Sequence, residues 1–127
     1  FHLAPRVGRI EAVEIDRGSV ARGEADAARL GIDNVTFRAI NARKYELPAN
    51  VELIAVDPPR AGLNKETRAQ ITESGARHLV YVSCDPATWA RDVGAFTQDG
   101  WRVVFARPYD FFPHTHHVEL LSLLSRD

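Results

Sequence analysis

The chain has 127 residues, of which 45% are hydrophobic and 26% are charged, with 16 basic and 17 acidic side chains. This length and composition predict one globular domain over residues 1–127 and exclude a disordered tail. The single cysteine excludes an internal disulfide framework and an all-cysteine zinc site. No apolar run reaches the ~18 residues of a membrane span, and the net charge of −1 gives no global reason to expect nucleic-acid binding. We therefore expect a cytoplasmic protein without a membrane partner.

Short apolar segments rich in β-branched residues alternate with segments of helical pattern along the chain. The predicted strands are Ile10–Ile15, Val35–Ile40, Val51–Val56, His78–Ser83, Trp101–Phe111 and His117–Leu124. The predicted helices are Ser19–Leu30, Lys65–Ser74 and Pro86–Phe96. Strands joined through helices form right-handed crossovers in a mostly parallel sheet. The last two strands lack a helix between them and should pair as an antiparallel hairpin, so the pattern predicts an α/β fold.

Ligands of such sheets bind at the carboxyl ends of the strands, which makes polar residues there candidates for function. Glu14 ends the first strand, where an acid can accept both hydroxyls of a ribose or simply face solvent. Asn41 follows the second strand; its amide could contact a purine edge, although a turn-forming asparagine suits the local sequence better. Asp57 follows the third strand and opens Asp-Pro-Pro-Arg, whose prolines fix a tight loop.

Cys84 lies between the end of a predicted strand and a predicted helix with Asp85 as N-cap and Pro86 in its first position. Free backbone N–H groups and the helix dipole favour a thiolate there, which is the environment of an activated nucleophile. Asp85 partly opposes this effect, and a lone cysteine is also commonly an inert buried residue. The spacing from Cys84 to Arg91 has one residue too many for a phosphatase-type cysteine loop.

The segment before the last predicted strand contains three histidines within four residues, His114, His116 and His117. Zinc proteins usually take ligands from more widely spaced positions together with a cysteine or carboxylate, so we expect no metal site. Glu119 follows among apolar residues, where desolvation would suit a general base working near neutral pH. The alternative is an edge-strand glutamate that faces solvent.

Three motifs together resemble the RNA (uracil-5-)-methyltransferases, which methylate C5 of uridine in tRNA or ribosomal RNA. They are D-P-P-R, S-C-D-P-A-T-W-A-R-D and F-P-H-T-H-H-V-E, and the resemblance extends from about Arg9 to Ser125. The last two motifs are not shared by methyltransferases in general. The resemblance implies a Rossmann-like class I methyltransferase fold, S-adenosyl-L-methionine as cofactor and RNA as the partner.

The resemblance also implies roles for individual residues. Cys84 matches the nucleophile and Glu119 the base, whereas Glu14, Asn41 and Asp57 match cofactor-binding positions. The chemistry by itself requires a nucleophile and a general base. C5 of uracil is a poor nucleophile until a thiolate adds at C6, and a base must then remove the C5 proton.

The sequence departs from the family before Glu14, where a first strand and a glycine-rich turn are expected and not found. We therefore expect the carboxyl-terminal part of a catalytic domain, with a strand missing between those that end at Ile15 and Val56. Another chain, self-association through the incomplete sheet, or a rearranged sheet could fill this gap. Two alternatives stay open: a non-catalytic fold fragment or oligomerising module, and a methyltransferase that acts on another acceptor.

Overall fold

The computed structural model describes residues 1–111, 113–115 and 118–127. Within them the chain divides into two compact units, Phe1–Tyr45 and Glu46–Asp127. The single domain expected over residues 1–127 stays a prediction. None of the helices in the described part of the chain combines the length and the apolar character that crossing a membrane requires.

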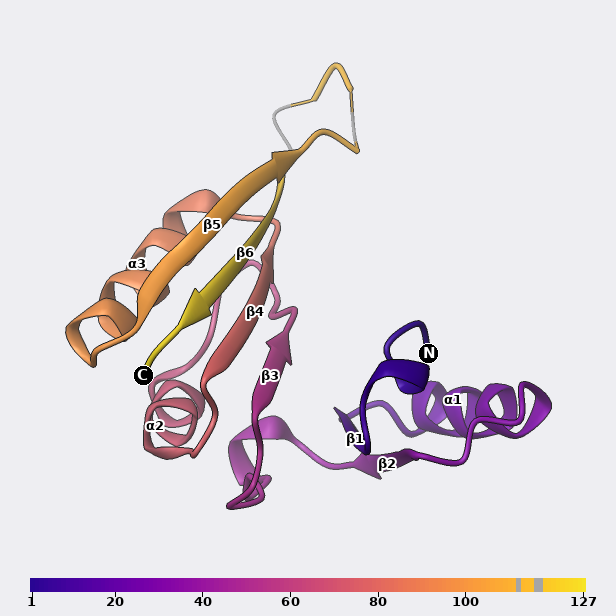
Figure 1. Cartoon of the computed structure of the whole chain (residues 1–127). Helices are drawn as coiled ribbons and strands as arrows, with labels where there is room; N and C mark the ends of the chain where they lie inside the picture. The colour runs from indigo at the N-terminus through magenta and orange to yellow at the C-terminus, as the bar shows by residue number, and fades with distance from the viewer. Residues whose placement is uncertain (112, 116–117) are drawn as a thin grey trace. The chain divides into compact units, whose positions relative to one another are not determined.

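The first unit is a β–α–β arrangement in which two parallel strands are joined by one helix (Figure 1). The strands pair in register from Ile10 opposite Val35 to Glu14 opposite Ala39. Both strands therefore end at the same edge of this small sheet. The elements in chain order are η1 (Ala4–Arg6), β1 (Ile10–Glu14), α1 (Arg17–Arg29), β2 (Val35–Ala39) and η2 (Ala42–Lys44).

Helix α1 begins two residues before its predicted start because Asp16 is its N-cap. The Asp16 carboxylate accepts a hydrogen bond from Ser19 N at 2.7 Å, which satisfies a backbone donor of the first turn. Gly31 follows the helix at φ 67°, a conformation that favours glycine. The helix packs closely on β2, because a Cβ atom at Gly23 would lie 2.5 Å from the Phe37 ring.

The second unit contains a four-stranded sheet in the order β3-β4-β6-β5. Strands β3 and β4 are parallel, and β6 runs antiparallel to both of its neighbours, β4 and β5. Figure 1 shows β6, in yellow, between β4 and the orange β5. The predicted carboxyl-terminal antiparallel hairpin is thus confirmed. The elements are β3 (Leu53–Val56), α2 (Lys65–Glu73), β4 (His78–Ser83), α3 (Pro86–Gln98), β5 (Arg102–Tyr109) and β6 (Glu119–Ser125).

Helices α2 and α3 cover one face of this sheet and form the main core with it. Alternate residues of β4, Leu79 and Tyr81, are fully buried beneath the helices, as the two-residue period of a strand requires. Trp101 packs edge-on against Phe96 with 6.0 Å between ring centroids. The buried cluster consists of Ile54, Leu63, Ile71, Ala76, Leu79, Tyr81, Val93, Phe96, Trp101 and Leu124.

The predicted strands and helices are all present, and their ends differ from the predictions by at most two residues. Strand β3 begins at Leu53 and not at Val51, because Glu52 O accepts hydrogen bonds from Arg77 N and His78 N just before the ladder starts. The last strand begins at Glu119; His117, its predicted start, lies outside the described residues.

The six strands belong to two separate sheets, β1-β2 and β3-β4-β6-β5. Among the described residues, no ladder joins a strand of the first unit to a strand of the second. The missing strand that the sequence predicts stays a prediction. Within the larger sheet β6 alone runs against the other three strands, as expected for a mostly parallel α/β fold.

Candidate active site

Cys84 and Glu119 lie at the same edge of the four-stranded sheet. The antiparallel ladder between β4 and β6 runs from His78 opposite Ser125 to Ser83 opposite Leu120. The next positions in this register are Cys84 and Glu119, and both residues are half-buried. The fold therefore brings the predicted nucleophile and the predicted base to the same end of the β4–β6 ladder, although they are far apart in the sequence.

The turn that contains Cys84 is fixed by hydrogen bonds on both sides of it. The buried Ser83 Oγ accepts from Asp85 N at 3.1 Å and lies 3.0 Å from Asp85 O, to which it donates. The Asp85 carboxylate in turn accepts from Thr88 N at 2.9 Å and is the predicted N-cap of α3. Cys84 forms no disulfide. Its backbone is thus held between the end of β4 and the first turn of α3.

This cap predicts a specific acid sensitivity. The Thr88 backbone N–H, which donates to Asp85, holds the pKa of that carboxyl below its ordinary value of 3.8. A lowered pKa in the folded state stabilises the fold above the ordinary value, and this contribution is lost as the pH falls through the folded-state pKa. We expect Asp85→Asn to have a lower Tm than the wild type at neutral pH, with the difference shrinking below about pH 4. A difference that stays constant down to about pH 2 would contradict this.

Asp57 reaches the same edge of the sheet from β3. Val56 is opposite Tyr81 in the parallel ladder, so Asp57 leaves the strand beside the last residues of β4. Its carboxylate is exposed and has no hydrogen bond or ion pair to any residue that the structure describes. Asp57, Cys84 and Glu119 therefore lie together at the end of one sheet, as the strand order predicts. An exposed carboxylate without a protein partner can accept hydrogen bonds from a ligand.

A buried carboxylate that sequence reasoning missed, Asp92, lies beneath the loop that follows Asp57. Asp92 is fully buried, and its Oδ2 accepts from Leu63 N at 2.7 Å and from Tyr81 Oη at 2.8 Å. Its Oδ1 accepts from Arg68 Nη1 at 2.7 Å and from Arg91 Nη2 at 2.9 Å. Burial and the bond to Asp92 raise the pKa of Tyr81, so its phenol stays a donor. The only sequence feature that pointed to Asp92 was its place at the end of the motif S-C-D-P-A-T-W-A-R-D.

The first unit brings Glu14 and Asn41 to the end of its own sheet. Glu14 is exposed; its Oε1 accepts from Asp16 N at 2.8 Å. Asn41 Oδ1 accepts from Arg43 N at 3.0 Å and begins η2, which confirms the turn-forming role that the local sequence favoured. The Asn41 Nδ2 donor has no partner among the described residues. One carboxylate and one amide donor are thus available at the carboxyl ends of two adjacent parallel strands.

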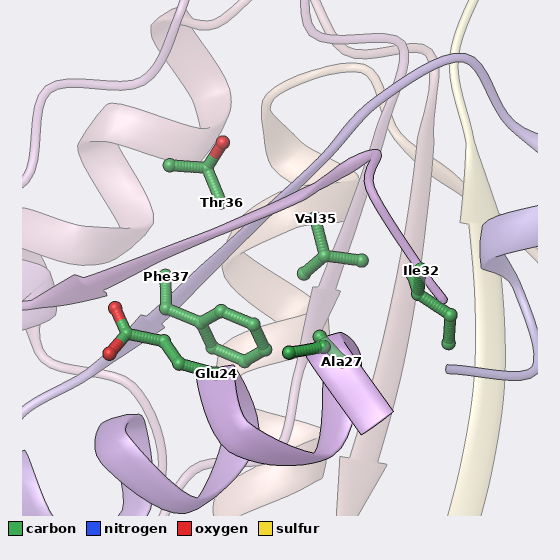
Figure 2. Close-up of a pocket in the computed structure, with 7 residues that line it drawn as sticks. Glu24, Ala27, Ile32, Val35, Thr36 and Phe37 are labelled. Carbon is green, nitrogen blue, oxygen red and sulfur yellow. The ribbon is translucent and has the colours of Figure 1, made fainter. Parts of the chain in front are cut away.

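A hollow beside α1 does not belong to this site. It lies along the amino-terminal half of β2, whereas Glu14 and Asn41 follow the carboxyl ends of the strands. Figure 2 shows the Phe37 ring between the Glu24 side chain and Ala27 in this view. Its lining residues are Glu24, Ala27, Ala28, Ile32, Val35, Thr36 and Phe37.

The described residues contain no group of three or more histidine, cysteine, aspartate or glutamate side chains arranged to hold a metal ion. His116 and His117, two of the three histidines considered for a metal site, lie outside the described residues.

Solved structures identify the class of fold. A Pyrococcus abyssi tRNA (uracil-54, C5)-methyltransferase in complex with S-adenosyl-L-homocysteine superposes with a TM-score of 0.86 at 29% identity, covering 97% of this chain and 30% of that one. The N-methyltransferase NodS from Bradyrhizobium japonicum superposes with a TM-score of 0.77 at 17% identity, covering 98% of this chain and 70% of that one. The second likeness concerns the fold alone. The fold is that of the class I methyltransferases, as the sequence predicted.

Sequence comparison narrows this class. The profile of the tRNA (uracil-5-)-methyltransferase family matches residues 39–127, and the chain belongs to this family. A 23S rRNA (uracil(747)-C(5))-methyltransferase RlmC from Vibrio vulnificus is 34% identical over 99% of this chain. A 23S rRNA (uracil(1939)-C(5))-methyltransferase RlmD from Hahella chejuensis is 37% identical over 98% of it. The chain spans 34% and 30% of the lengths of these two relatives.

Proposed function

We propose that this chain contributes the catalytic residues of an S-adenosyl-L-methionine-dependent RNA methyltransferase that acts on C5 of uridine. The observation that supports this most is the placement of Cys84 and Glu119 at the same end of the β4–β6 ladder, in a chain of the uracil-5-methyltransferase family. Relatives are named for uridines of 23S rRNA and of tRNA, so the proposed substrate is one of these RNAs. The unpaired cysteine suits a reducing compartment, and we place the enzyme in the cytoplasm.

Cys84 would open the reaction by covalent catalysis. Its thiolate adds to C6 of the uracil ring, forming an S–C6 bond, and the electrons of the C5–C6 double bond move onto the C5 enolate system. C5 is then electron-rich and can accept a methyl group, which an isolated uracil does poorly. The target uracil must leave the base stack of the RNA, because C5 and C6 of the ring are not accessible to the enzyme while the base is stacked.

Glu119 would close the reaction as the general base. Once C5 bears both a methyl group and a proton, the Glu119 carboxylate takes that proton. The electrons of the C5–H bond re-form the C5–C6 double bond, the S–C6 bond breaks, and the electron pair returns to the Cys84 sulfur. This step requires a base close to the thiol, which the register of β4 and β6 supports.

Three residues are proposed to hold the cofactor, which supplies the methyl group when bound. The Glu14 carboxylate suits the two ribose hydroxyls, because it ends a parallel strand and is exposed. Asn41 Nδ2 and the Asp57 carboxylate have no partner within the described ranges; the first can donate to an acceptor on the adenine ring, and the second can accept from a cofactor amine. Each unit, taken by itself, thus presents polar groups of the kind that the cofactor requires.

The ribose role of Glu14 predicts a loss of cofactor affinity. We expect Glu14→Gln to raise the Kd for S-adenosyl-L-homocysteine roughly 10- to 100-fold, because hydrogen bonds to a charged acceptor are the stronger ones. Isothermal titration calorimetry on the complete product of the parent gene measures this. Glu24→Gln is the matched control, since Glu24 is exposed on α1 of the same unit and away from the strand ends. Equal affinities for the Glu14 and Glu24 variants would contradict the role.

The function as a whole is tested by the position of the transferred methyl group. The complete gene product is incubated with tRNA and rRNA transcripts and methyl-labelled cofactor, and the product nucleosides are separated. We expect 5-methyluridine. Label recovered on an amino nitrogen, with full activity after Cys84 is replaced, would instead favour the alternative acceptor, because that chemistry needs no thiol.

A further inference from the structure

We propose that Arg91 and Asp92 are positioning residues that hold the loop after Asp57 at a set place relative to Cys84. This inference rests on the proposed function, because it gives the two residues a purpose in that reaction. It starts from a connection along the chain: helix α3 begins at Pro86, two residues after Cys84. A segment attached to the first turns of α3 is therefore attached to the nucleophile as well.

The loop is attached to those turns through backbone groups of Arg60, Ala61 and Leu63. Thr88, Arg91 and Asp92 lie three and four residues apart in α3, so they share one face of the helix. Thr88 Oγ1 donates to Arg60 O at 3.0 Å. Arg91 Nη2 donates to Ala61 O at 2.8 Å. The Asp92 carboxylate accepts from Leu63 N at 2.7 Å.

The residue between these contacts shows how closely the loop approaches the helix. Gly62 has φ 73°, which favours glycine, and a Cβ atom there would lie 2.5 Å from Asp92 Oδ2 and 2.7 Å from Arg91 Nη2. The contacts are to main-chain atoms, so they set the path of the loop whatever its side chains are. That path continues back through Pro59 and Pro58, whose rings restrict it further, to Asp57.

A substitution of Arg91 can test the position of the loop with little effect on folding. The Arg91 side chain is 51% exposed while its partner Asp92 is fully buried, so the pair is only half desolvated and Arg91 matters less to stability than Asp92 does. When Arg91 is lost, Asp92 keeps Arg68, Tyr81 and Leu63 as partners. The bonds that disappear are two to Asp92 Oδ1, at 3.0 and 2.9 Å, and those to Ala61 O and Leu63 O, at 2.8 and 3.3 Å, which restrain the loop.

The test compares Arg91→Met with Arg29→Met in the complete gene product. Arg29 is also an exposed arginine in an ion pair, with Asp26 at 2.9 Å, but it lies on α1. We expect Arg29→Met to keep the wild-type Tm and Arg91→Met to lower it far less than Asp92→Ala does, because Asp92 keeps its other partners. We expect kcat/KM for RNA methylation to fall roughly 10- to 100-fold in Arg91→Met alone, because small misplacements of reacting groups have effects of this size. Arg91→Lys, which keeps the charge and one donor, should recover part of the loss.

A double variant shows whether Arg91 acts through the loop. If it does, Arg91→Met adds little further loss to Asp57→Asn, whereas independent effects multiply. The proposal is overturned if the losses of kcat/KM in the two single variants multiply in the double variant. It is also overturned if kcat/KM falls only together with a lowered Tm in both Arg91→Met and Arg91→Lys. If Asp57→Asn lowers activity and Arg91→Met does not, this proposal alone fails. Full activity of Asp57→Asn contradicts the role proposed for Asp57 in the function itself.

Discussion

Glu119→Gln is expected to trap the RNA on Cys84 as an adduct that survives denaturation. Glutamine cannot take the C5 proton, so the S–C6 bond forms and is not released by elimination. Turnover should fall roughly 10²- to 10⁴-fold, the usual contribution of a general base. The adduct appears as a band of reduced mobility on a denaturing gel that carries label from both RNA and protein. The placement of the two residues at the same end of the β4–β6 ladder is the structural reason for this expectation.

Two further variants make this result specific. Cys84→Ala should abolish both methylation and the adduct, alone and in combination with Glu119→Gln. Glu66→Gln removes an exposed carboxylate from the first turn of α2 and should leave turnover unchanged. Methylation that persists in Cys84→Ala would falsify the role of the thiol. Absence of adduct in Glu119→Gln, with turnover still lost, would assign Glu119 to an earlier step.

Among the substitutions proposed for the second unit, we expect Asp92→Ala to destabilise the fold most. The substitution leaves Tyr81 Oη and Leu63 N without their buried acceptor and removes the partner of the largely buried Arg68. Breaking a buried ion pair on one side typically costs about 3–5 kcal/mol, because the remaining groups stay desolvated. Unfolding in urea, followed by tryptophan fluorescence, measures the change; Trp101 lies in the same core cluster.

Asp99→Ala is the matched control for Asp92. Asp99 lies at the carboxyl end of the same helix and is exposed, with a single 3.3 Å contact from Thr72 Oγ1. We expect its removal to change the free energy of unfolding by no more than about 0.5 kcal/mol. Similar losses for the two variants would show that the bonds to Asp92 contribute no more than a surface contact.

The order and type of the elements were predictable because each one is specified by local patterns. Asp85 and Pro86 announce the start of α3, and Asp85 accepts from Thr88 N as an N-cap should. The apolar alternation in β4 predicts a strand with one buried face, which Leu79 and Tyr81 form. The element ends were less predictable. The start of β3 depends on the hydrogen bonds that Glu52 O accepts from Arg77 N and His78 N. No local sequence pattern predicts these bonds.

The candidate residues at strand ends were predictable for a different reason. Parallel strands joined by helices end at one edge of a sheet, so the order of strands and helices is enough to make the polar residues after β1, β2, β3 and β4 candidates. The metal alternative rested on residues that include His116 and His117, outside the described part of the chain. Asp92 was missed because it looks like an ordinary polar position in a helix. Its burial comes from the loop and strand that pack over it.

The sequence by itself determined the α/β pattern, the helix caps, and the residue types that uracil C5 chemistry needs, since these depend on near neighbours and on motifs. The tertiary structure decided two further matters. The insertion of β6 between β4 and β5 brought Glu119 to the end of the sheet where Cys84 lies, and the packing of α3 buried Asp92 beneath the loop after Asp57. Both depend on strand order and long-range packing. Hydrogen bonds between distant segments leave no local trace in a single sequence.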